Sequence, residues 1–265
     1  MTILESIVLG AVQGLTEFLP VSSSGHLQLA KELMGVEIEQ NITFDVALHA
    51  ATVLSTIVVL WREVWGLLRG LFVRGMNQEK SYILKLIISM IPIGFVGFLL
   101  KDSIDAMTSS SYIMLVVGVM LLCTAALLSF AYYAKPRQKE TISYRDAFII
   151  GLSQAVAVMP GLSRSGTTIA TGLLLGNKKS SVATFSFLMV LAPIMGQAFL
   201  DVVDGGFAIS GVSTVALAAG FVTAFVVGCL ACRFMIEVVK RAKLVWFAIY
   251  CAMAGFLSLG LYIFN

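Results

Sequence analysis

Long apolar runs separated by short charged loops are the main pattern along the chain. Six runs are long enough to cross a bilayer as single helices, since about 20 apolar residues span its hydrocarbon layer. They cover residues 42–61, 81–100, 112–134, 181–203, 212–235 and 244–264. Only helices and closed barrels satisfy their backbone groups in lipid. The pattern therefore predicts an all-α polytopic membrane protein.

Two further apolar stretches, residues 2–35 and 144–177, are interrupted near their middle. The interruptions, at 20–25 and 160–166, are rich in proline, glycine and serine. Each arm is too short to cross a bilayer, and the two arms together are too long for one straight helix. We therefore expect two re-entrant helix pairs, each of which enters and leaves on the same side of the membrane.

The basic residues support this topology. With both broken segments re-entrant, every lysine and arginine except Lys31, Lys101 and Arg164 falls on one side of the membrane. Basic loops mark the cytoplasmic side, so both chain ends are expected outside. A full crossing by either broken segment would divide the basic loops between the two faces.

Composition agrees with residence in a membrane. The chain is 58% hydrophobic and 12% charged, with a mean hydropathy of +0.94, whereas soluble domains carry about 25% charged residues. We expect no nucleic-acid partner and no cleavable signal peptide. The four cysteines lie in apolar stretches, so the C-x-x-C of Cys229 and Cys232 is interpreted as packing.

A repeat relates the two halves of the chain. A shift of 141 residues aligns them without a gap, and the matched pairs include Gly10/Gly151, Gln13/Gln154, Ser22/Ser163, Ser24/Ser165 and Gly25/Gly166. Each half holds one re-entrant pair and three transmembrane helices, and because three is odd, the halves insert upside down. We expect a single membrane domain, residues 1–265, with a first repeat at 1–140 and a second, inverted repeat at 141–265.

The inverted repeat should bring the two breaks together near the membrane midplane. Each break begins a second half-helix whose first N–H groups are unpaired and whose dipole end is positive. Two such ends form an anion site, most simply one for phosphate. The residues expected to bind it, the serines mainly as helix caps, are Ser22, Ser24, Gly25, Ser163, Ser165, Gly166 and Thr168.

The two breaks differ in their charged residues. Where the first has Glu17, Ser23 and His26, the second has Val158, Arg164 and Thr167. An arginine at membrane depth is costly and needs a partner, which is Glu17, a bound anion or both. Its guanidinium fork suits phosphoryl oxygens.

Two short spacings in the first broken segment suggest chemistry. Glu17 follows Gln13 by one helical turn, so together they could hold Mg²⁺ or Ca²⁺ or position a water; alternatively, Glu17 simply pairs with Arg164. Ser23 and His26 lie three residues apart, which suits a nucleophile and its base; alternatively, His26 bonds to neighbouring backbone. His49 is interpreted as a packed polar residue.

The segments VQGLTEFLPVSSSGH (12–26) and PGLSRSGTT (160–168) resemble the two signature motifs of the undecaprenyl-diphosphate phosphatase family, the bacitracin-resistance proteins. The resemblance runs along the whole chain in length, repeat and segment order. It implies a bacterial inner-membrane enzyme that hydrolyses the long-chain isoprenoid diphosphate to the monophosphate with Mg²⁺ or Ca²⁺. This reaction recycles the lipid carrier for peptidoglycan and other envelope polymers.

Motif positions imply roles for individual residues. Glu17 matches the family's essential glutamate, Ser23 and His26 match its catalytic pair, and Arg164 matches its diphosphate-binding arginine. The family has Glu or Gln at the position of Gln13, so the neutral residue here weakens a metal site made of two carboxylates. The implied partners are a prenyl diphosphate and membrane lipids, with access from the outer face; a homodimer is left open.

Two rival functions share part of the pattern. Inverted repeats with helices broken at the midplane are also transporter architecture, so a flippase for polyprenyl-phosphate lipids stays open. A phosphatidic-acid type of lipid phosphatase is rejected, because it needs a second histidine after a Ser-Arg and none follows Arg164. For hydrolysis, attack by Ser23 and direct attack by water, with His26 or Glu17 as base, both stay open.

Overall fold

A computed structural model describes residues 1–36, 42–108, 110–133, 139–196, 212–241 and 244–264. This described part is helical, with one isolated β-bridge and no strand. Its helices are α1 (Ile3–Thr16), α2 (Ser23–Met34), α3 (Ile42–Val59), α4 (Trp61–Leu71), α5 (Gln78–Thr108), α6 (Ile113–Tyr133), α7 (Tyr144–Val156), α8 (Arg164–Leu174), α9 (Lys179–Met189), α11 (Thr214–Lys240) and α12 (Val245–Phe264). The predicted all-α polytopic class is confirmed.

Five of the described helices are long and apolar enough to cross a membrane: the Gln78–Gly97 part of α5, α6, α9 with its continuation to Gly196, α11 and α12. They lie in five of the six predicted spans. The remaining prediction, 42–61, corresponds to α3, which passes the same test only together with α4. The two helices meet at an angle of 79°, so they do not form one straight span.

The bend between α3 and α4 was not predicted, and its cause is the amphipathic character of α4. Trp61 and Trp65 are exposed and stack with ring centroids 5.7 Å apart, and the guanidinium of Arg69 lies 5.0 Å from the Trp65 ring. Tryptophan and arginine together favour the interface between lipid and water over the hydrocarbon layer. The chain therefore turns where the apolar run ends.

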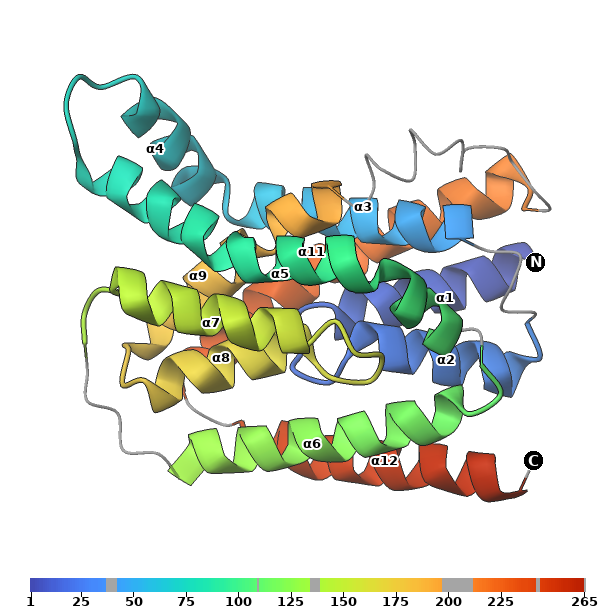
Figure 1. The fold of residues 1–265 in the computed structure, drawn as a ribbon. Helices are drawn as coiled ribbons and strands as arrows, with labels where there is room; N and C mark the ends of the chain where they lie inside the picture. The colour runs from blue at the N-terminus through green and yellow to red at the C-terminus, as the bar shows by residue number, and fades with distance from the viewer. Residues whose placement is uncertain (37–41, 109, 134–138, 197–211, 242–243, 265) are drawn as a thin grey trace.

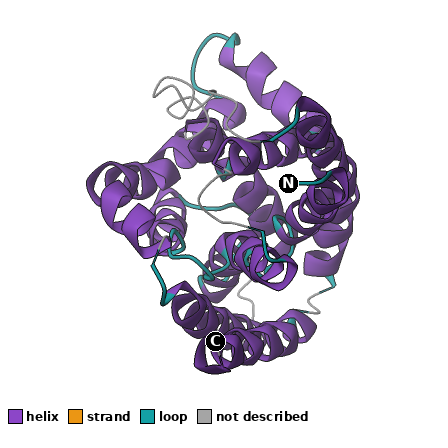
Figure 2. Ribbon diagram, turned by 90° about the vertical axis from the view of Figure 1, so that its right-hand side faces the viewer, coloured by secondary structure: helices purple, strands orange, loops and turns teal. Residues whose placement is uncertain are grey.

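Both broken segments fold as the predicted helix–break–helix pairs. The α1–α2 pair approaches from the end of the bundle that carries both chain termini, and the α7–α8 pair approaches from the opposite end (Figures 1 and 2). Their breaks, residues 17–22 and 157–163, meet in the interior. This arrangement accords with an inverted repeat, whose boundary at residue 140 stays a prediction.

Glycines set the closest helix contacts around these pairs. A Cβ added to Gly10 of α1 would lie 2.4 Å from the carbonyl oxygen of Gly220 in α11, and one added to Gly151 of α7 would lie 2.3 Å from that of Ser89 in α5. Small residues allow such approach in membrane bundles. Each re-entrant pair is thus held by a long helix of the other half, while α6 and α12 pack together on one side (Figure 1).

Candidate active site

The first break follows directly from the end of α1. Glu17 is the C-terminal cap of that helix, and its side chain is 4% exposed. The chain then turns so that Ser22 caps α2, with its hydroxyl accepting a bond from the Gly25 N–H at 3.3 Å. Ser22 has a φ of 70°, a conformation that is uncommon outside glycine and that is typical of functional sites.

The second break starts α8 in a similar way but without this strain. Ser163 caps the helix at a φ of −70°, and its hydroxyl accepts from the Gly166 N–H at 3.0 Å. The Ser163 N–H donates to the Thr124 hydroxyl of α6 at 3.0 Å. The predicted caps Ser22 and Ser163 are therefore confirmed, and α6 anchors the second one.

The two breaks touch each other, as the repeat predicts. Ser165 donates a hydrogen bond to the carbonyl oxygen of Leu19 at 2.9 Å. A Cβ added to Gly25 would lie 3.1 Å from the Cα of Gly161, so the first turn of α2 lies against the second break. Both predicted glycine positions, Gly25 and Gly166, serve this contact, because a Cβ on Gly166 would lie 3.2 Å from Pro20.

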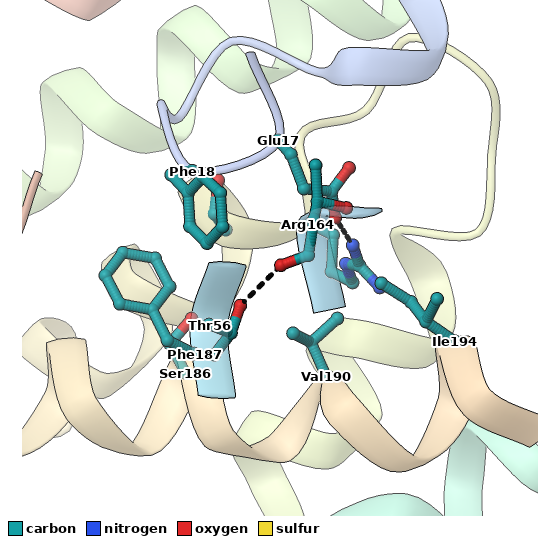
Figure 3. Close-up of a pocket in the computed structure, with 10 residues that line it drawn as sticks. Glu17, Phe18, Thr56, Arg164, Ser186, Phe187, Val190 and Ile194 are labelled. Carbon is teal, nitrogen blue, oxygen red and sulfur yellow. Dashed lines mark hydrogen bonds and ion pairs between the residues drawn. The ribbon is translucent and has the colours of Figure 1, made fainter. Parts of the chain in front are cut away.

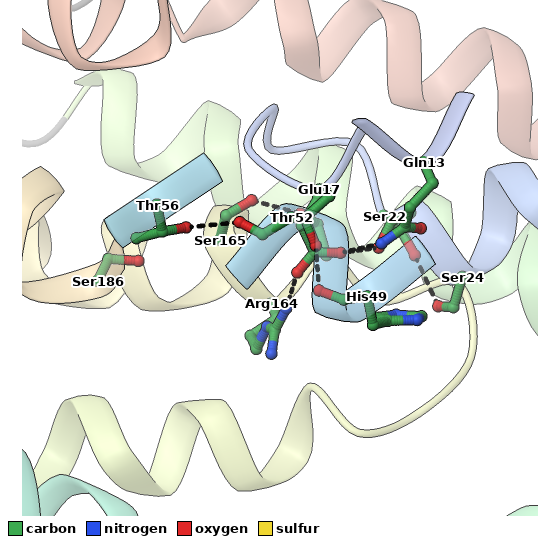
Figure 4. A network of polar contacts seen from close by, with 12 residues as sticks. Gln13, Glu17, Ser22, Ser24, His49, Thr52, Thr56, Arg164, Ser165 and Ser186 are labelled. Carbon is green, nitrogen blue, oxygen red and sulfur yellow. Dashed lines mark hydrogen bonds and ion pairs between the residues drawn. The ribbon is translucent and has the colours of Figure 1, made fainter. Parts of the chain in front are cut away.

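Glu17 joins the charged residues of the two halves. One carboxylate oxygen pairs with the guanidinium of Arg164, whose side chain is 23% exposed. The other accepts from the Ser23 hydroxyl at 2.6 Å and from the Gln13 amide at 3.0 Å. The predicted Arg164–Glu17 partnership and the shared face of Gln13 and Glu17 are confirmed (Figure 4).

No hydrogen bond joins Ser23 and His26 among the described residues, so the expected nucleophile–base pair stays a prediction. Nδ1 of His26 lies 2.8 Å from the carbonyl oxygen of Ser22, and Nε2 lies 2.8 Å from the hydroxyl of Tyr250 in α12. The His26 and Tyr250 rings also stack. Ser23 instead points to Glu17, so the alternative in which His26 bonds to neighbouring backbone describes this structure.

Three of the other predicted anion-binding residues have different partners here. Ser24 lies 3.3 Å from the Ser22 hydroxyl, and Ser165 bonds to Leu19, so neither caps a helix. The Thr168 hydroxyl donates to the Arg164 carbonyl oxygen at 2.8 Å and lies 2.6 Å from the hydroxyl of Ser186 in α9. Ser24 is the exposed member of this group and is free to face a ligand.

A small pocket opens beside the Glu17–Arg164 pair (Figure 3). Thr52 and Thr56 of α3 and Ser186 of α9 give it polar walls that the sequence analysis missed. The spacing of His49, Thr52 and Thr56 on one helix face was an available signal. Phe18, Phe187, Val190 and Ile194 form the apolar wall. The volume of the pocket is about 10 Å³, room for roughly one water molecule.

The donor set near Glu17 fits a divalent cation in part. The described residues contain no group of three or more His, Cys, Asp or Glu that could hold a metal. The Oε1 atom of Gln13, however, is buried and has no partner among the described residues. One carboxylate, one amide oxygen and the oxygens of a bound phosphate match how Mg²⁺ is commonly held.

Gly161 in the second break should be essential for stability. Its φ is 90°, and a Cβ there would lie 2.7 Å from the backbone of Val117. We expect Gly161→Ala to lower the free energy of unfolding by about 1–3 kcal/mol or more, through backbone strain. Thermal unfolding in detergent measures this. In Gly260→Ala, an added Cβ meets no described atom within 4 Å, and equal midpoints for the two variants would contradict the prediction.

Tyr250 should act through His26. The change Tyr250→Phe removes the hydroxyl and with it one hydrogen bond. We therefore expect the catalytic rate, kcat, to fall by about fivefold. The same loss should not appear on top of His26→Gln, because coupled residues are not additive. Rates of the two single variants and the double variant measure this coupling, and fully additive losses would show that the contact has no role.

The fold and the site together define a polytopic helical membrane protein with an arginine–glutamate pair between two helix starts. Residues 6–257 match the family described as bacitracin resistance protein BacA, and the chain belongs to that family.

Similar proteins agree over almost their whole length. A Parabacteroides distasonis protein is 58% identical over 98% of both chains, and a Bacteroides fragilis protein is 57% identical over 96% of both. A more distant one from Methanosphaera stadtmanae is 35% identical over 98% of both. Each of the three is named undecaprenyl-diphosphatase.

Proposed function

We propose that this protein hydrolyses undecaprenyl diphosphate to undecaprenyl phosphate and inorganic phosphate. The observation that carries the proposal is the meeting of Arg164, at the start of α8, with Glu17 and the start of α2. The names of the relatives support the same substrate. The product is the lipid carrier for peptidoglycan, and its recycling accounts for bacitracin resistance.

Arg164 and the two helix starts bind the diphosphate in this mechanism. The guanidinium has five N–H donors, so it can take phosphoryl oxygens while it still contacts Glu17. The N–H groups that begin α2 and α8 add positive dipole ends on either side. These donors stabilise the charge on the equatorial oxygens as the phosphoryl group is transferred.

Glu17 is the base that the geometry favours. Its carboxylate accepts a hydrogen bond from the Ser23 hydroxyl at 2.6 Å. In one route, the Ser23 oxygen bonds to the terminal phosphorus, the bond to undecaprenyl phosphate breaks, and Glu17 takes the proton; water then releases phosphate from the serine. In the other route, Glu17 activates a water that attacks directly. His26 then positions Ser22 and the start of α2 rather than taking the proton.

A divalent cation, Mg²⁺ or Ca²⁺, would be held by Glu17 and by Oε1 of Gln13 together with the phosphate oxygens. When bound, the cation would neutralise part of the negative charge on the phosphoryl oxygens. Gln13 keeps its oxygen oriented by donating its amide to Glu17.

The membrane placement is a further part of the proposal. We infer a bacterial inner membrane, with both termini outside and the site reached from the outer face, because the α1–α2 pair enters from the end that carries the termini (Figure 1). A homodimer formed through the exposed apolar faces of the described helices belongs to the same proposal.

The test is phosphate release from undecaprenyl diphosphate by purified protein in detergent, with Mg²⁺, with Ca²⁺ and with chelator. We expect release with metal and a large loss with chelator. A flippase for the same lipid is the second candidate, favoured by the two helix pairs that enter from opposite ends. The flippase would be supported instead of the phosphatase by two results together. The protein would bind the lipid in detergent without releasing phosphate, and it would move the lipid across the membrane of vesicles.

A further inference from the structure

An open apolar groove lies between α5 and α7. Its walls are residues from Ile91 to Ile104 of α5 and from Phe148 to Met159 of α7 and the second break, and every lining residue is apolar. Its volume is about 510 Å³. Two of the lining side chains, Phe95 and Val156, are more than 60% exposed, so the groove opens to the lipid side of the bundle.

In the repeat, the helix pair that matches α5 and α7 is α11 and α1. There, α1 packs closely on α11, since a Cβ on Gly14 would lie 2.6 Å from the Ala224 carbonyl oxygen. The repeat position of Gly14 is occupied in α7 by Ala155, which lines the groove. The two matching helix pairs therefore differ. α1 packs tightly on α11 at Gly14, whereas α7 and α5 leave a groove at Ala155.

A proline of α5 lies where this helix pair is open. Pro92 lies inside the helix and lines the groove. It has no N–H to donate to the preceding turn, and its ring crowds that turn, which bends a helix. Beyond it, Cβ atoms added to Gly94 and Gly97 would meet no described atom within 4 Å. α5 therefore contacts α7 tightly at Ser89 and leaves space after Pro92.

The inner end of the groove lies at the second break. Val158 and Met159 belong to the break that leads directly to Arg164. Val158 also occupies the repeat position of Glu17. An apolar residue that lines the groove therefore replaces the carboxylate of the first half. From Ile91 to Ile104 the helix rises about 20 Å, a large part of the roughly 30 Å hydrocarbon layer. A chain attached to a diphosphate at Arg164 can therefore continue along the groove.

We propose that this groove binds the part of the isoprenoid tail next to the diphosphate; the inference rests on the proposed function. The occupant is a branched apolar chain that carries a diphosphate at one end. Phe95 and Phe148 give the groove broad apolar surfaces, and burial of each methylene and methyl group adds affinity. The groove then selects long prenyl diphosphates, while the polar residues at the breaks perform the reaction.

The test narrows the groove without touching the polar site. Leu152→Trp and Val156→Trp enlarge exposed side chains on the groove wall, and Val222→Trp makes a matched change at an exposed position of α11. We measure KM and kcat for undecaprenyl diphosphate and for isopentenyl diphosphate, whose single isoprenoid unit is too short to fill the groove. We expect the groove variants to raise KM for the long substrate by about tenfold, the equivalent of two buried methylene groups. The short substrate and Val222→Trp should change by less than about twofold.

A second readout does not depend on turnover. A prenyl diphosphate with a benzophenone in its first isoprenoid units is cross-linked by light to the wild-type protein, and labelled peptides are identified by mass spectrometry. Labels concentrated on α5 and α7 support the proposal. Labels spread evenly over the lipid-facing helices, or an equal KM change for both substrates or in Val222→Trp, would overturn it. If the wild type releases phosphate from neither substrate, the proposed function itself fails, and the labels still report whether the tail lies in the groove.

Discussion

Replacement of Arg164 by alanine is expected to abolish phosphate release while leaving the protein in the membrane. The guanidinium pairs with Glu17 between the two helix starts, where the phosphoryl charge develops in the proposed mechanism. Arginines in this role contribute about 10³–10⁵ in rate. Phosphate release at saturating substrate measures the loss. Arg164→Lys should recover only a small part of the rate, because an ammonium cannot form the two-pronged contact.

Two controls separate chemistry from folding. Arg145→Ala removes an exposed arginine near the start of α7 and should keep the wild-type rate. Arg164→Ala also leaves Glu17 buried without its cation, and breaking such a pair costs about 3–5 kcal/mol of stability. Thermal unfolding in detergent should show this. A rate within about tenfold of the wild type in Arg164→Ala would contradict the assigned role.

Replacement of Glu17 by glutamine is the second change with a large expected effect. Glutamine keeps the size of the side chain but cannot act as a base. It therefore cannot take the proton of the Ser23 hydroxyl, which donates a hydrogen bond to Glu17 at 2.6 Å. Loss of a general base costs about 10²–10⁴ in rate. The metal dependence should weaken as well, because the only carboxylate of the proposed metal-binding group is removed. Rates across a titration of Mg²⁺ measure both effects.

The double variant Glu17→Gln with Arg164→Gln distinguishes stability from catalysis. Each single change leaves one buried charge unpaired, whereas the double change leaves none. We expect the double variant to unfold at a higher temperature than either single variant and to stay inactive. Activity that returned together with stability would mean that the pair is structural only.

Much of the fold was predictable because the membrane imposes simple rules. Apolar length, broken segments and the 141-residue repeat placed the helices, and the opposite charges of Glu17 and Arg164 predicted their pairing. The partner of His26 was not predictable. Tyr250 lies 224 residues away, in an apolar helix where one tyrosine carries no signal, and it reaches His26 only through the packing of the last helix.

The hydrogen-bond partners of Ser23 and His26 could not be read from their spacing. Both residues lie in the first turn of α2, where residues three apart share a face, yet His26 bonds to Ser22 and Tyr250. Glu17, at the end of the preceding helix, offers Ser23 a charged acceptor, and such bonds are stronger than neutral ones. The groove between α5 and α7 was not predictable either, because apolar sequence alone does not show where two helices leave space between them.

The exchange of partners between the two predicted repeats, α1 with α11 and α7 with α5, has a consequence for how the chain assembles. The most extensive helix contact of α1, and that of α7, is made with a helix of the other repeat, so either repeat on its own would lack that contact. Fragments 1–140 and 141–265 produced separately should therefore be inactive alone and regain activity only when they assemble.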